Sequence, residues 1–382
     1  MEYKLEDLFD LQMGKTPSRN NPEYWNSDDH KWISIGDLSR CEKYIEDTKE
    51  YLSDKAVEES GISIIPAGTV VMSFKLSIGK TAIVPEPMYS NEAIMSFRDK
   101  HVVDLLPDYI YYMFLGRDWD AGTNKAVMGK TLNKATLSKI KVRIHSIADQ
   151  REIVQILDKV SAVIEAHQSE LKKLDDLIKA RFVEMFGDPR ANPNGYDIEE
   201  LRSSCSVITG NTPPRSVEVY YGNYIEWIKT DNIITGRTNP TQAAECLSEE
   251  GMKVGRIVDK DAILMACIAG SIASIGRVCI TNRKVAFNQQ INAVVPKHYD
   301  VHFLYVLLQI SKNYLVEEIN MALKGILSKS KLEDKLFYVP PMELQKQFAS
   351  FVVQVDKSKV VVQKALNEAQ LLFDSLMQQY FG

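Results

Sequence analysis

An internal repeat that spans the whole chain constrains its fold more than any other feature. WISIGDL at 32–38 matches WIKTDNI at 227–233, and SIGKTAIV at 77–84 matches SIGRVCIT at 274–281. The offset between the copies stays at 195 to 197 residues, so they differ only by small loop insertions. A repeat of this length predicts two copies of one globular fold that differ in detailed sequence.

Each copy ends in a long segment with the apolar periodicity of a helix, and both segments finish in Phe-Gly. Apolar residues recur there at alternating spacings of three and four, which is typical of a coiled-coil seam. A helix of about 40 residues is roughly 60 Å long, too long to stand alone in a compact domain. We therefore expect the two helices to pack along one another. The seam residues include Ile153, Ile156, Val160, Val163, His167, Leu171, Leu174, Ile178 and Met185 in the first helix and Phe348, Phe351, Val355, Val362, Leu366, Ala369, Phe373, Leu376 and Tyr380 in the second.

The segments outside these helices are rich in strand signals. Runs such as 62–74 and 255–267 mix β-branched residues with Gly, Pro and Asp breaks, and 109–119 and 301–319 have the pattern of helices packed on a sheet. We expect an α+β protein in which two strand-rich heads are joined by two long antiparallel helices that form a coiled coil, with pseudo-twofold symmetry. The expected boundaries are 1–146 for the first head, 147–187 for the central helix, 188–341 for the second head and 342–382 for the last helix.

Composition indicates an ordinary globular protein. The chain has 382 residues, enough for two or more domains, and no apolar run approaches the roughly 20 residues of a membrane span. Five cysteines without a Cys-x-x-Cys pair disfavour a disulfide framework and a zinc site. We expect a cytoplasmic protein. The net charge of −5 gives no overall attraction to nucleic acid.

Gly-Lys-Thr occurs three times but does not form a phosphate-binding loop. That loop needs a glycine five residues before the second one, and the three copies have Phe9, Phe74 and Asn124 there. The first copy lies in LQMGKTPSRN at 11–20, which matches VITGNTPPRS at 207–216. The shared feature is therefore a turn of the form Gly-x-Thr-Pro.

The chain also lacks the motifs of an enzyme that would act on DNA by itself. An adenine methyltransferase needs an Asn/Asp-Pro-Pro-aromatic loop and a glycine-rich cofactor turn, and the nearest strings are NTPP at 211–214 and NPNG at 192–195. Glu-Tyr-Lys at 2–4 has no preceding Pro-Asp pair for a nuclease. We expect a protein without catalytic activity and without a metal site.

The duplicated order of these motifs resembles the specificity subunit of type I restriction-modification systems. Gly-x-Thr-Pro, Trp-Ile, Ser-Ile-Gly-Lys/Arg, the step LNKATL (132–137) or LSKSKL (327–332) and the Phe-Gly-terminated helix all occur twice. The resemblance implies that each head is a target-recognition domain for one half of a bipartite, asymmetric DNA site. It also implies that the helices set the half-site spacing and dock two methyltransferase subunits, with restriction subunits as possible further partners. No cofactor is expected on this chain, and S-adenosylmethionine is expected on the partner methyltransferase.

Base edges are read by Arg or Lys at guanine and by Asn or Gln at adenine, while phosphates are contacted mostly by basic side chains. The repeat brings such residues to matching places in the two heads. The candidate DNA-binding residues are Lys15, Ser18, Arg19, Asn20, Lys75, Lys80, Asn91, Lys130 and Lys134 in the first head and Asn211, Arg215, Ser216, Arg277, Asn288, Gln289, Gln290, Lys324, Lys329 and Lys331 in the second.

Simpler interpretations exist for several of these residues. The first head has 19 basic and 22 acidic side chains and the second has 17 of each, so a given basic residue is more often a solvated surface charge than a DNA contact. Trp32 and Trp227 fit a core position, and Asn91 and Asn288 fit turns that bond to their own backbone. The competing function is a coiled-coil adaptor with two protein-binding heads that read no DNA.

Overall fold

The computed structural model describes residues 1–75, 77–119, 132–317, 319 and 325–382. The chain separates into two compact units. Unit 1 consists of Met1–Glu165 and Leu366–Gly382, and unit 2 of Ala166–Ala365. In the part of the chain that the structure describes, no helix is long and apolar enough to cross a membrane.

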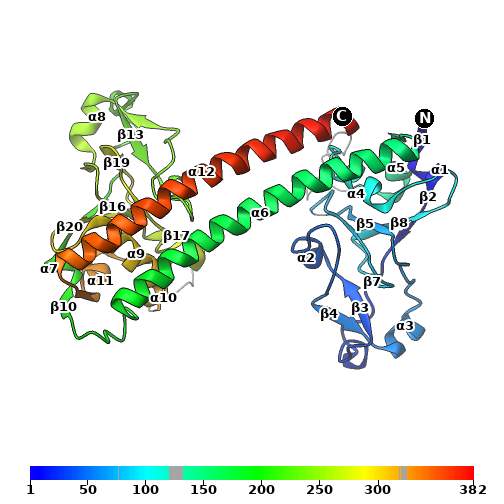
Figure 1. Ribbon diagram of the computed structural model, residues 1–382, viewed down its shortest axis with the longest axis horizontal. Coiled ribbons are helices and arrows are strands. Elements are labelled where there is room, and N and C mark those ends of the chain that lie inside the picture. Colours follow the sequence, from blue (N-terminus) through cyan, green and yellow to red (C-terminus); the bar gives the residue numbers. More distant parts are fainter. Residues whose placement is uncertain (76, 120–131, 318, 320–324) are drawn as a thin grey trace. The chain divides into compact units, whose positions relative to one another are not determined.

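In its described residues, unit 1 contains three small sheets, and strands of these sheets are labelled in Figure 1. The largest has the order β2-β8-β5-β6 and is antiparallel throughout, and the second has the order β4-β3-β7 with β3 and β7 parallel. Helix α4 covers the four-stranded sheet with Tyr109, Tyr112 and Phe114, which are buried with Phe97 of β8. The elements are β1 (Glu2–Lys4), α1 (Leu5–Leu8), β2 (Phe9–Met13), η1 (Pro22–Tyr24), β3 (His30–Ile33), α2 (Ile35–Leu38), β4 (Glu50–Leu52), α3 (Asp54–Ser60), β5 (Val70–Ser73), β6 (Thr81–Ile83), β7 (Tyr89–Ser90), β8 (Ile94–Asp99), α4 (Pro107–Leu115), α5 (Lys134–Ser138) and β9 (Lys141–Arg143).

Unit 2 repeats this plan. Its four-stranded antiparallel sheet has the order β11-β20-β16-β18, and β13 and β19 form the parallel pair that corresponds to β3 and β7. The elements are β10 (Asp197–Glu200), α7 (Leu201–Ser204), β11 (Cys205–Thr209), η2 (Glu218–Tyr220), β12 (Tyr221–Gly222), β13 (Ile225–Ile228), η3 (Thr230–Asn232), β14 (Cys246–Leu247), α8 (Glu249–Val254), β15 (Ile257–Val258), β16 (Ile263–Ala266), β17 (Ile268–Ala269), η4 (Ile272–Ser274), β18 (Val278–Ile280), β19 (Val285–Phe287), β20 (Ile291–Pro296), α9 (Val301–Ile310), α10 (Lys312–Val316), β21 (Gly325–Ile326), α11 (Lys329–Glu333) and β22 (Leu336–Val339).

The two tryptophans matched by the repeat are core residues, as predicted. Trp32 on β3 and Trp227 on β13 each have 2% of their surface exposed. Each lies on a strand of a parallel pair, where Trp32 is opposite Tyr89 and Trp227 is opposite Ala286. In both units the other strand of the pair is followed directly by a turn at an asparagine. The sequence repeat therefore reflects a repeated strand register.

Two helices of 40 residues each, α6 (Ile147–Phe186) and α12 (Met342–Phe381), contribute to both units. In unit 1 the C-terminal part of α12 packs beside the N-terminal part of α6, with Met377 in the same core as Ile153 and Leu157. In unit 2 the C-terminal part of α6 packs beside the N-terminal part of α12, with Phe182 5.4 Å from Phe348 between ring centroids. Within each unit the helices are therefore antiparallel, as predicted.

The buried face of α6 is broader than the predicted seam. The prediction that Val163 is a seam residue is wrong, since 47% of its surface is exposed. Leu157, Phe182 and Phe186, which lie outside the predicted seam, are fully buried. The reason is that each end of the helix packs against a head core as well as against the partner helix, which requires a wider apolar face.

The segment 301–319, predicted as one helix, contains two. Helix α9 ends at Ile310 and α10 begins at Lys312, with Ser311 between them. The backbone N–H of Ser311 still donates to Leu307 O at 3.0 Å, so the chain turns without leaving the core that α9 fills.

Candidate DNA-recognition loops

The Gly-x-Thr-Pro turn fixes one loop of each head against the Asn turn that follows the parallel strand pair. In unit 1 the backbone N–H of Lys15 donates to Ser90 O at 2.8 Å, and the Thr16 hydroxyl donates to the Glu92 carboxylate. The Trp32 indole N–H donates to Lys15 O at 3.1 Å. The turn is therefore held from the strand side, and its tip at residues 18–20 is exposed.

Unit 2 uses the same bonds with different side chains. The backbone N–H of Asn211 donates to Phe287 O at 3.1 Å, the Thr212 hydroxyl donates to the amide oxygen of Gln289, and Trp227 Nε1 donates to Asn211 O at 3.3 Å. The backbone contacts of the turn are thus common to both heads. The side chains around the turn differ between the heads.

The arginine of this turn has the same surroundings in both units. Arg19 forms two hydrogen bonds to the Glu50 carboxylate, at 2.5 and 3.1 Å, and its guanidinium lies 3.7 Å from the ring centroid of Trp25. Its side chain remains 48% exposed. An arginine that is stacked on an aromatic ring and paired with a carboxylate has a fixed orientation, with further N–H donors still available.

In unit 2, Arg215 lies 2.7 Å from the Glu245 carboxylate and 4.5 Å from the ring centroid of Tyr221. Its side chain is 55% exposed. Lys229 also pairs with Glu245, and these two bonds lower the pKa of the Glu245 carboxyl. The two arginines therefore have equivalent surroundings within their own heads.

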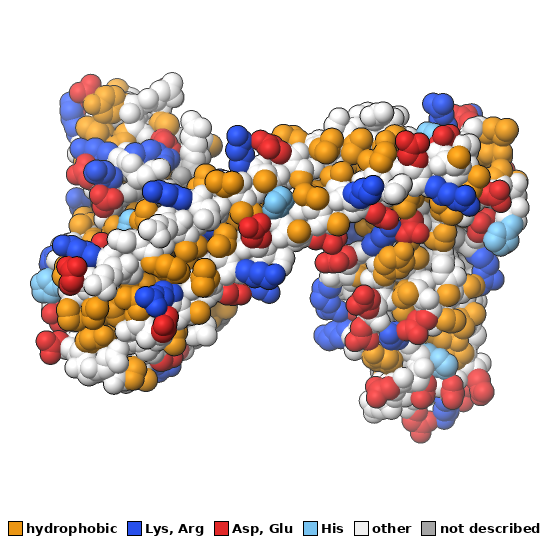
Figure 2. All heavy atoms as spheres, viewed as in Figure 1, with side chains coloured by type: hydrophobic (Ala, Val, Ile, Leu, Met, Phe, Trp, Pro, Cys, Tyr) orange, Lys and Arg blue, Asp and Glu red, His pale blue; other side chains and the backbone are white. Residues whose placement is uncertain are grey.

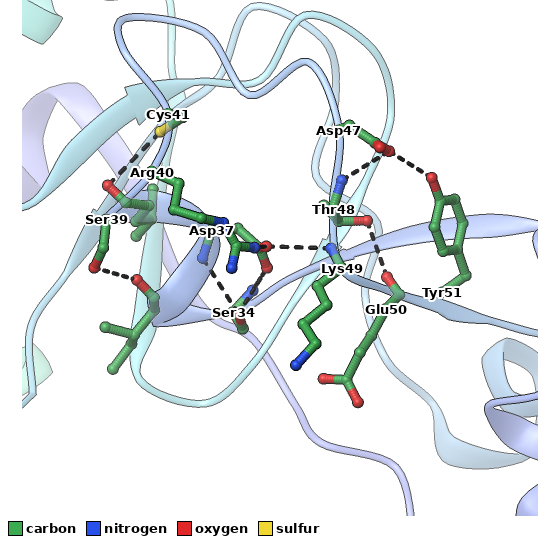
Figure 3. A network of polar contacts seen from close by, with 12 residues as sticks. Ser34, Asp37, Ser39, Arg40, Cys41, Asp47, Thr48, Lys49, Glu50 and Tyr51 are labelled. Carbon is green, nitrogen blue, oxygen red and sulfur yellow. Dashed lines mark hydrogen bonds and ion pairs between the residues drawn. The ribbon is translucent and has the colours of Figure 1, made fainter. Parts of the chain in front are cut away.

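A buried carboxylate organises the segment that supplies Glu50 (Figure 3). Asp37 has 3% of its surface exposed and accepts the backbone N–H of Ser34 at 2.8 Å, its hydroxyl at 2.6 Å and the backbone N–H of Lys49 at 3.2 Å. Arg40 pairs with the same carboxylate. Asp37 thus caps α2 and connects it to the strand β4, which begins at Glu50.

Three of the candidate amides hold backbone instead of projecting into solvent. The backbone N–H of Ala93 donates to Asn91 Oδ1 at 3.0 Å, and that of Gln290 donates to Asn288 Oδ1 at 3.1 Å, which confirms both as turn formers. The Asn211 amide donates to Val254 O at 2.9 Å and accepts from the backbone N–H of Arg256 at 2.7 Å. Gln290 in turn accepts from the side chain of Asn288 at 3.2 Å.

The loop between β5 and β6 brings further basic groups to the turn of unit 1. A hydrogen bond from Thr16 lowers the pKa of the Glu92 carboxyl, and the nearby charges of Lys75 and Arg19 lower it further. Lys80 donates to the Ser39 hydroxyl at 2.6 Å, so it lies beside α2. Lys15 donates to Ser60 O at 2.5 Å. The structure therefore groups Arg19 and Lys75 near the Glu92 carboxylate, whereas the Lys15 ammonium lies at the carbonyl group of Ser60.

The other candidates lie at several places. In unit 2, Arg277 donates to Ser274 O at 3.2 Å, and Gln289 is exposed beside Thr212. The remaining exposed candidates are Ser18, Asn20 and Ser216 in the turns, Lys134 at the start of α5, and Lys329 and Lys331 in α11, where Lys329 pairs with Glu333 at 3.5 Å. Lys130 and Lys324 lie outside the described residues.

The acidic partners of the two arginines were missed from the sequence. The repeat contains a signal for them, because Glu50 and Glu245 are separated by the same offset of 195 residues that separates Trp32 from Trp227. Glu92 and Gln289 are likewise matched, each directly after an Asn of the turn. Among the residues that the structure describes, no group of three or more His, Cys, Asp or Glu side chains could hold a metal ion.

Comparison with known proteins identifies this architecture. The family described as "Type I restriction modification DNA specificity domain" matches residues 1–175 and 193–370. The chain belongs to this family. The protein is therefore the component for sequence-specific DNA recognition in a restriction-modification complex and not the enzyme of that complex.

Individual relatives and structures agree with this assignment. The type I restriction enzyme MjaIX specificity subunit of Methanocaldococcus jannaschii is 24% identical over 404 residues, which cover 98% of this chain and 90% of that protein. The EcoR124I/EcoR124II specificity subunit of Escherichia coli is 28% identical over 152 residues, 38% of this chain and 37% of that protein. The S subunit of a type I system from M. genitalium has a TM-score of 0.57 at 13% identity and covers 100% of this chain and 96% of that one. This last likeness concerns the fold alone.

Proposed function

We propose that each head of this specificity-family protein reads one half of a bipartite, asymmetric DNA site. The observation that carries the proposal is that both heads hold one loop with the same backbone bonds and surround it with different side chains. Lys15 stands where Asn211 stands in the other head, and Glu92 stands where Gln289 stands. A shared scaffold with different exposed groups supports two different half-sites.

Within this proposal Arg19 and Arg215 are the first candidates for guanine. A stacked, carboxylate-paired arginine loses little conformational freedom when it bonds to a base edge, and arginine to guanine is the commonest specific contact in the major groove. Ser18, Asn20 and Ser216 are exposed next to these arginines in the chain, Gln289 is exposed beside Thr212, and all four supply further donors and acceptors. Lys75, Lys134 and Lys331 are candidates for phosphate contacts, which position the protein without reading sequence.

The long helices are proposed to dock the methyltransferase subunits, with restriction subunits as further partners. Hydrophobic side chains are exposed along the visible face of α12 (Figure 2). Val361 is 69% exposed in unit 2, and Leu371 is 69% exposed in unit 1. Neither head has an excess of basic side chains, so strong DNA binding would require these partners. S-adenosylmethionine would be held by the methyltransferase and not by this chain.

The test is co-expression with a type I methyltransferase subunit from the same genome, followed by mapping of methylated adenines across the host genome at single-base resolution. We expect modification confined to one motif of two short specified halves separated by a fixed gap. Arg19→Ala should relax the sequence requirement in one half, and Arg215→Ala in the other. A stable complex that methylates without any split motif would instead support an adaptor, which the family assignment disfavours.

A further inference from the structure

A network in unit 1 joins the recognition head to the long helix α6. The Lys43 ammonium lies 2.6 Å from the Asp108 carboxylate on α4 and 2.7 Å from the Asp158 carboxylate on α6. Two hydroxyl groups complete it: Tyr44 donates to Asp108 at 2.7 Å, and Tyr112 donates to Asp158 at 2.6 Å. The side chain of Lys43 is only 18% exposed. The Asp108 and Asp158 side chains are 30% and 46% exposed, so solvent screens part of the charge, but a cation that bonds to two carboxylates is more restricted in direction than a single surface ion pair.

The backbone of the same residue is attached to the head. The N–H of Ile83, on strand β6, donates to Lys43 O at 2.9 Å, and the N–H of Ile45 donates to Ile83 O at 3.1 Å. Lys43 therefore connects three elements through one residue, with its main chain on the sheet edge and its side chain on α4 and α6. Apolar packing between head and helix has no preferred direction by itself, whereas this connection fixes an angle.

Unit 2 has a corresponding connection built from different groups. The N–H of Ile280, on strand β18, donates to Thr238 O at 2.7 Å, and the Thr238 hydroxyl donates to the Asp356 carboxylate on α12 at 2.8 Å. Thr238 is the residue that the repeat matches with Lys43, as Ile280 is matched with Ile83. The same place in both units thus joins head to helix, through a partly buried cation in unit 1 and a hydroxyl group in unit 2.

We propose that Lys43 and Thr238 are positioning residues that set the angle of each head on its long helix and so restrict the gap between half-sites. The inference rests on the proposed function, in which each head reads one half-site. A change in head angle moves the base-reading loop along the DNA, and a displacement of about 3.4 Å is one base pair. Loss of the Lys43 cation would also leave Asp108 and Asp158 as two like charges that repel one another.

The test compares variants by genome-wide mapping of methylated adenines after co-expression with the methyltransferase. For Lys43→Met we expect the two half-site sequences to be unchanged, but sites with a gap one base pair longer or shorter to be modified at least tenfold more often than with the wild-type chain. Lys43→Arg keeps the cation and should restore the single gap. Lys139→Met, an exposed lysine of the same head, is the control and should behave as wild type.

Thr238→Val replaces the hydroxyl group with a methyl group of similar size, and it is the deciding variant if Lys43→Met does not assemble. It should also widen the range of gaps. If the wild-type chain directs methylation to a split motif and both Lys43→Met and Thr238→Val keep its single gap, the positioning role is overturned. This holds even if total methylation falls, because a loss of stability alone lowers the occupancy of sites without changing the gap between their halves. A wild-type chain that directs methylation to no split motif would overturn the proposed function, and this inference with it.

Discussion

The backbone of Gly14 runs so close to Ser90 that a Cβ atom on Gly14 would lie 2.1 Å from the carbonyl oxygen of Ser90. In the other unit a Cβ on Gly210 would lie 2.1 Å from the carbonyl oxygen of Asn288. The approach of the two turns is possible only without a side chain. This contact explains why the Gly-x-Thr-Pro motif occurs twice and why it need not bind phosphate.

Replacement of either glycine by alanine should therefore destabilise the protein. We expect Gly14→Ala or Gly210→Ala to lower the free energy of unfolding by about 3 kcal/mol, because backbone carbonyl groups must move to admit the methyl group. Gly36→Ala is the matched control, since the nearest atom to a Cβ there is 3.4 Å away and the position lies in α2. It should change stability by less than about 1 kcal/mol. Urea denaturation followed by circular dichroism measures both, and equal effects would contradict the close-approach explanation.

The aromatic end of α6 should stabilise unit 2 through packing in the head. Phe182 is fully buried and stacks 5.4 Å from Phe303, so Phe182→Ala should cost about 3–5 kcal/mol of unfolding free energy. Val183, the next residue, is 49% exposed, and Val183→Ala should stay within about 0.5 kcal/mol. Chemical denaturation of the full chain tests this. Similar losses for the two variants would mean that α6 does not insert into this core.

The pair formed by Glu226 and Arg283 should make stability depend on pH. Arg283 donates to the two carboxylate oxygens of Glu226 at 2.8 and 2.7 Å, and these bonds hold the pKa of Glu226 below its usual value of 4.5. A carboxyl group whose pKa is lower in the folded than in the unfolded state stabilises the fold above the unfolded value, and this stabilisation is lost as pH falls through the folded pKa.

Glu226→Gln should accordingly cost about 1–2 kcal/mol at neutral pH and progressively less below about pH 4. Denaturation curves at neutral and acidic pH give the difference. The control is Glu184→Gln, which removes the ion pair between Glu184 and Arg181. The Glu184 side chain is 67% exposed, so we expect the free energy of unfolding to change by less than about 0.5 kcal/mol. A cost for Glu226→Gln that is independent of pH would show that the charge is not what matters.

Val361 offers a test of the proposed docking face on α12. Val361→Asp places a charge on a side chain that is 69% exposed, so the fold should be unaffected. If the methyltransferase covers this face, burial of the new carboxylate should weaken assembly at least about tenfold. Co-purification and size-exclusion chromatography with the methyltransferase measure the extent of assembly. The control is Val102→Asp in the first head, where the side chain is 56% exposed. Equal assembly of the two variants would show that the part of α12 around Val361 is not in the interface.

Much of the architecture could be predicted because the sequence contains two copies of the same pattern. Trp32 and Trp227 were identified as core residues from their matched positions, and the two long helices from their apolar spacing. The same spacing wrongly predicts that Val163 is a buried seam residue, because periodicity gives the direction of a buried face but not its width. The break at Ser311 was also missed, because no Pro or Gly marks it.

The candidate site was less predictable, because a side chain's partner depends on contacts distant in sequence. Asn211 had the residue type of a base reader, yet its amide bonds to the backbone of Val254 and Arg256. Arg19 was a candidate from its place in the turn, but Glu50 is 31 residues away and reaches it only through the register of β3 and β4. Lys43 lies in none of the repeated motifs, so no sequence signal indicates its role.

The sequence by itself determined the repeat, the two helices, the core tryptophans and the family, because each depends on local periodicity or on residues matched at a fixed offset. The tertiary structure decided which polar side chains hold the loops, which remain exposed, and where each head joins its helix. Those outcomes depend on hydrogen bonds between segments far apart in the chain. A hydrogen bond requires its donor and acceptor within about 3 Å, a condition that only the folded chain can meet.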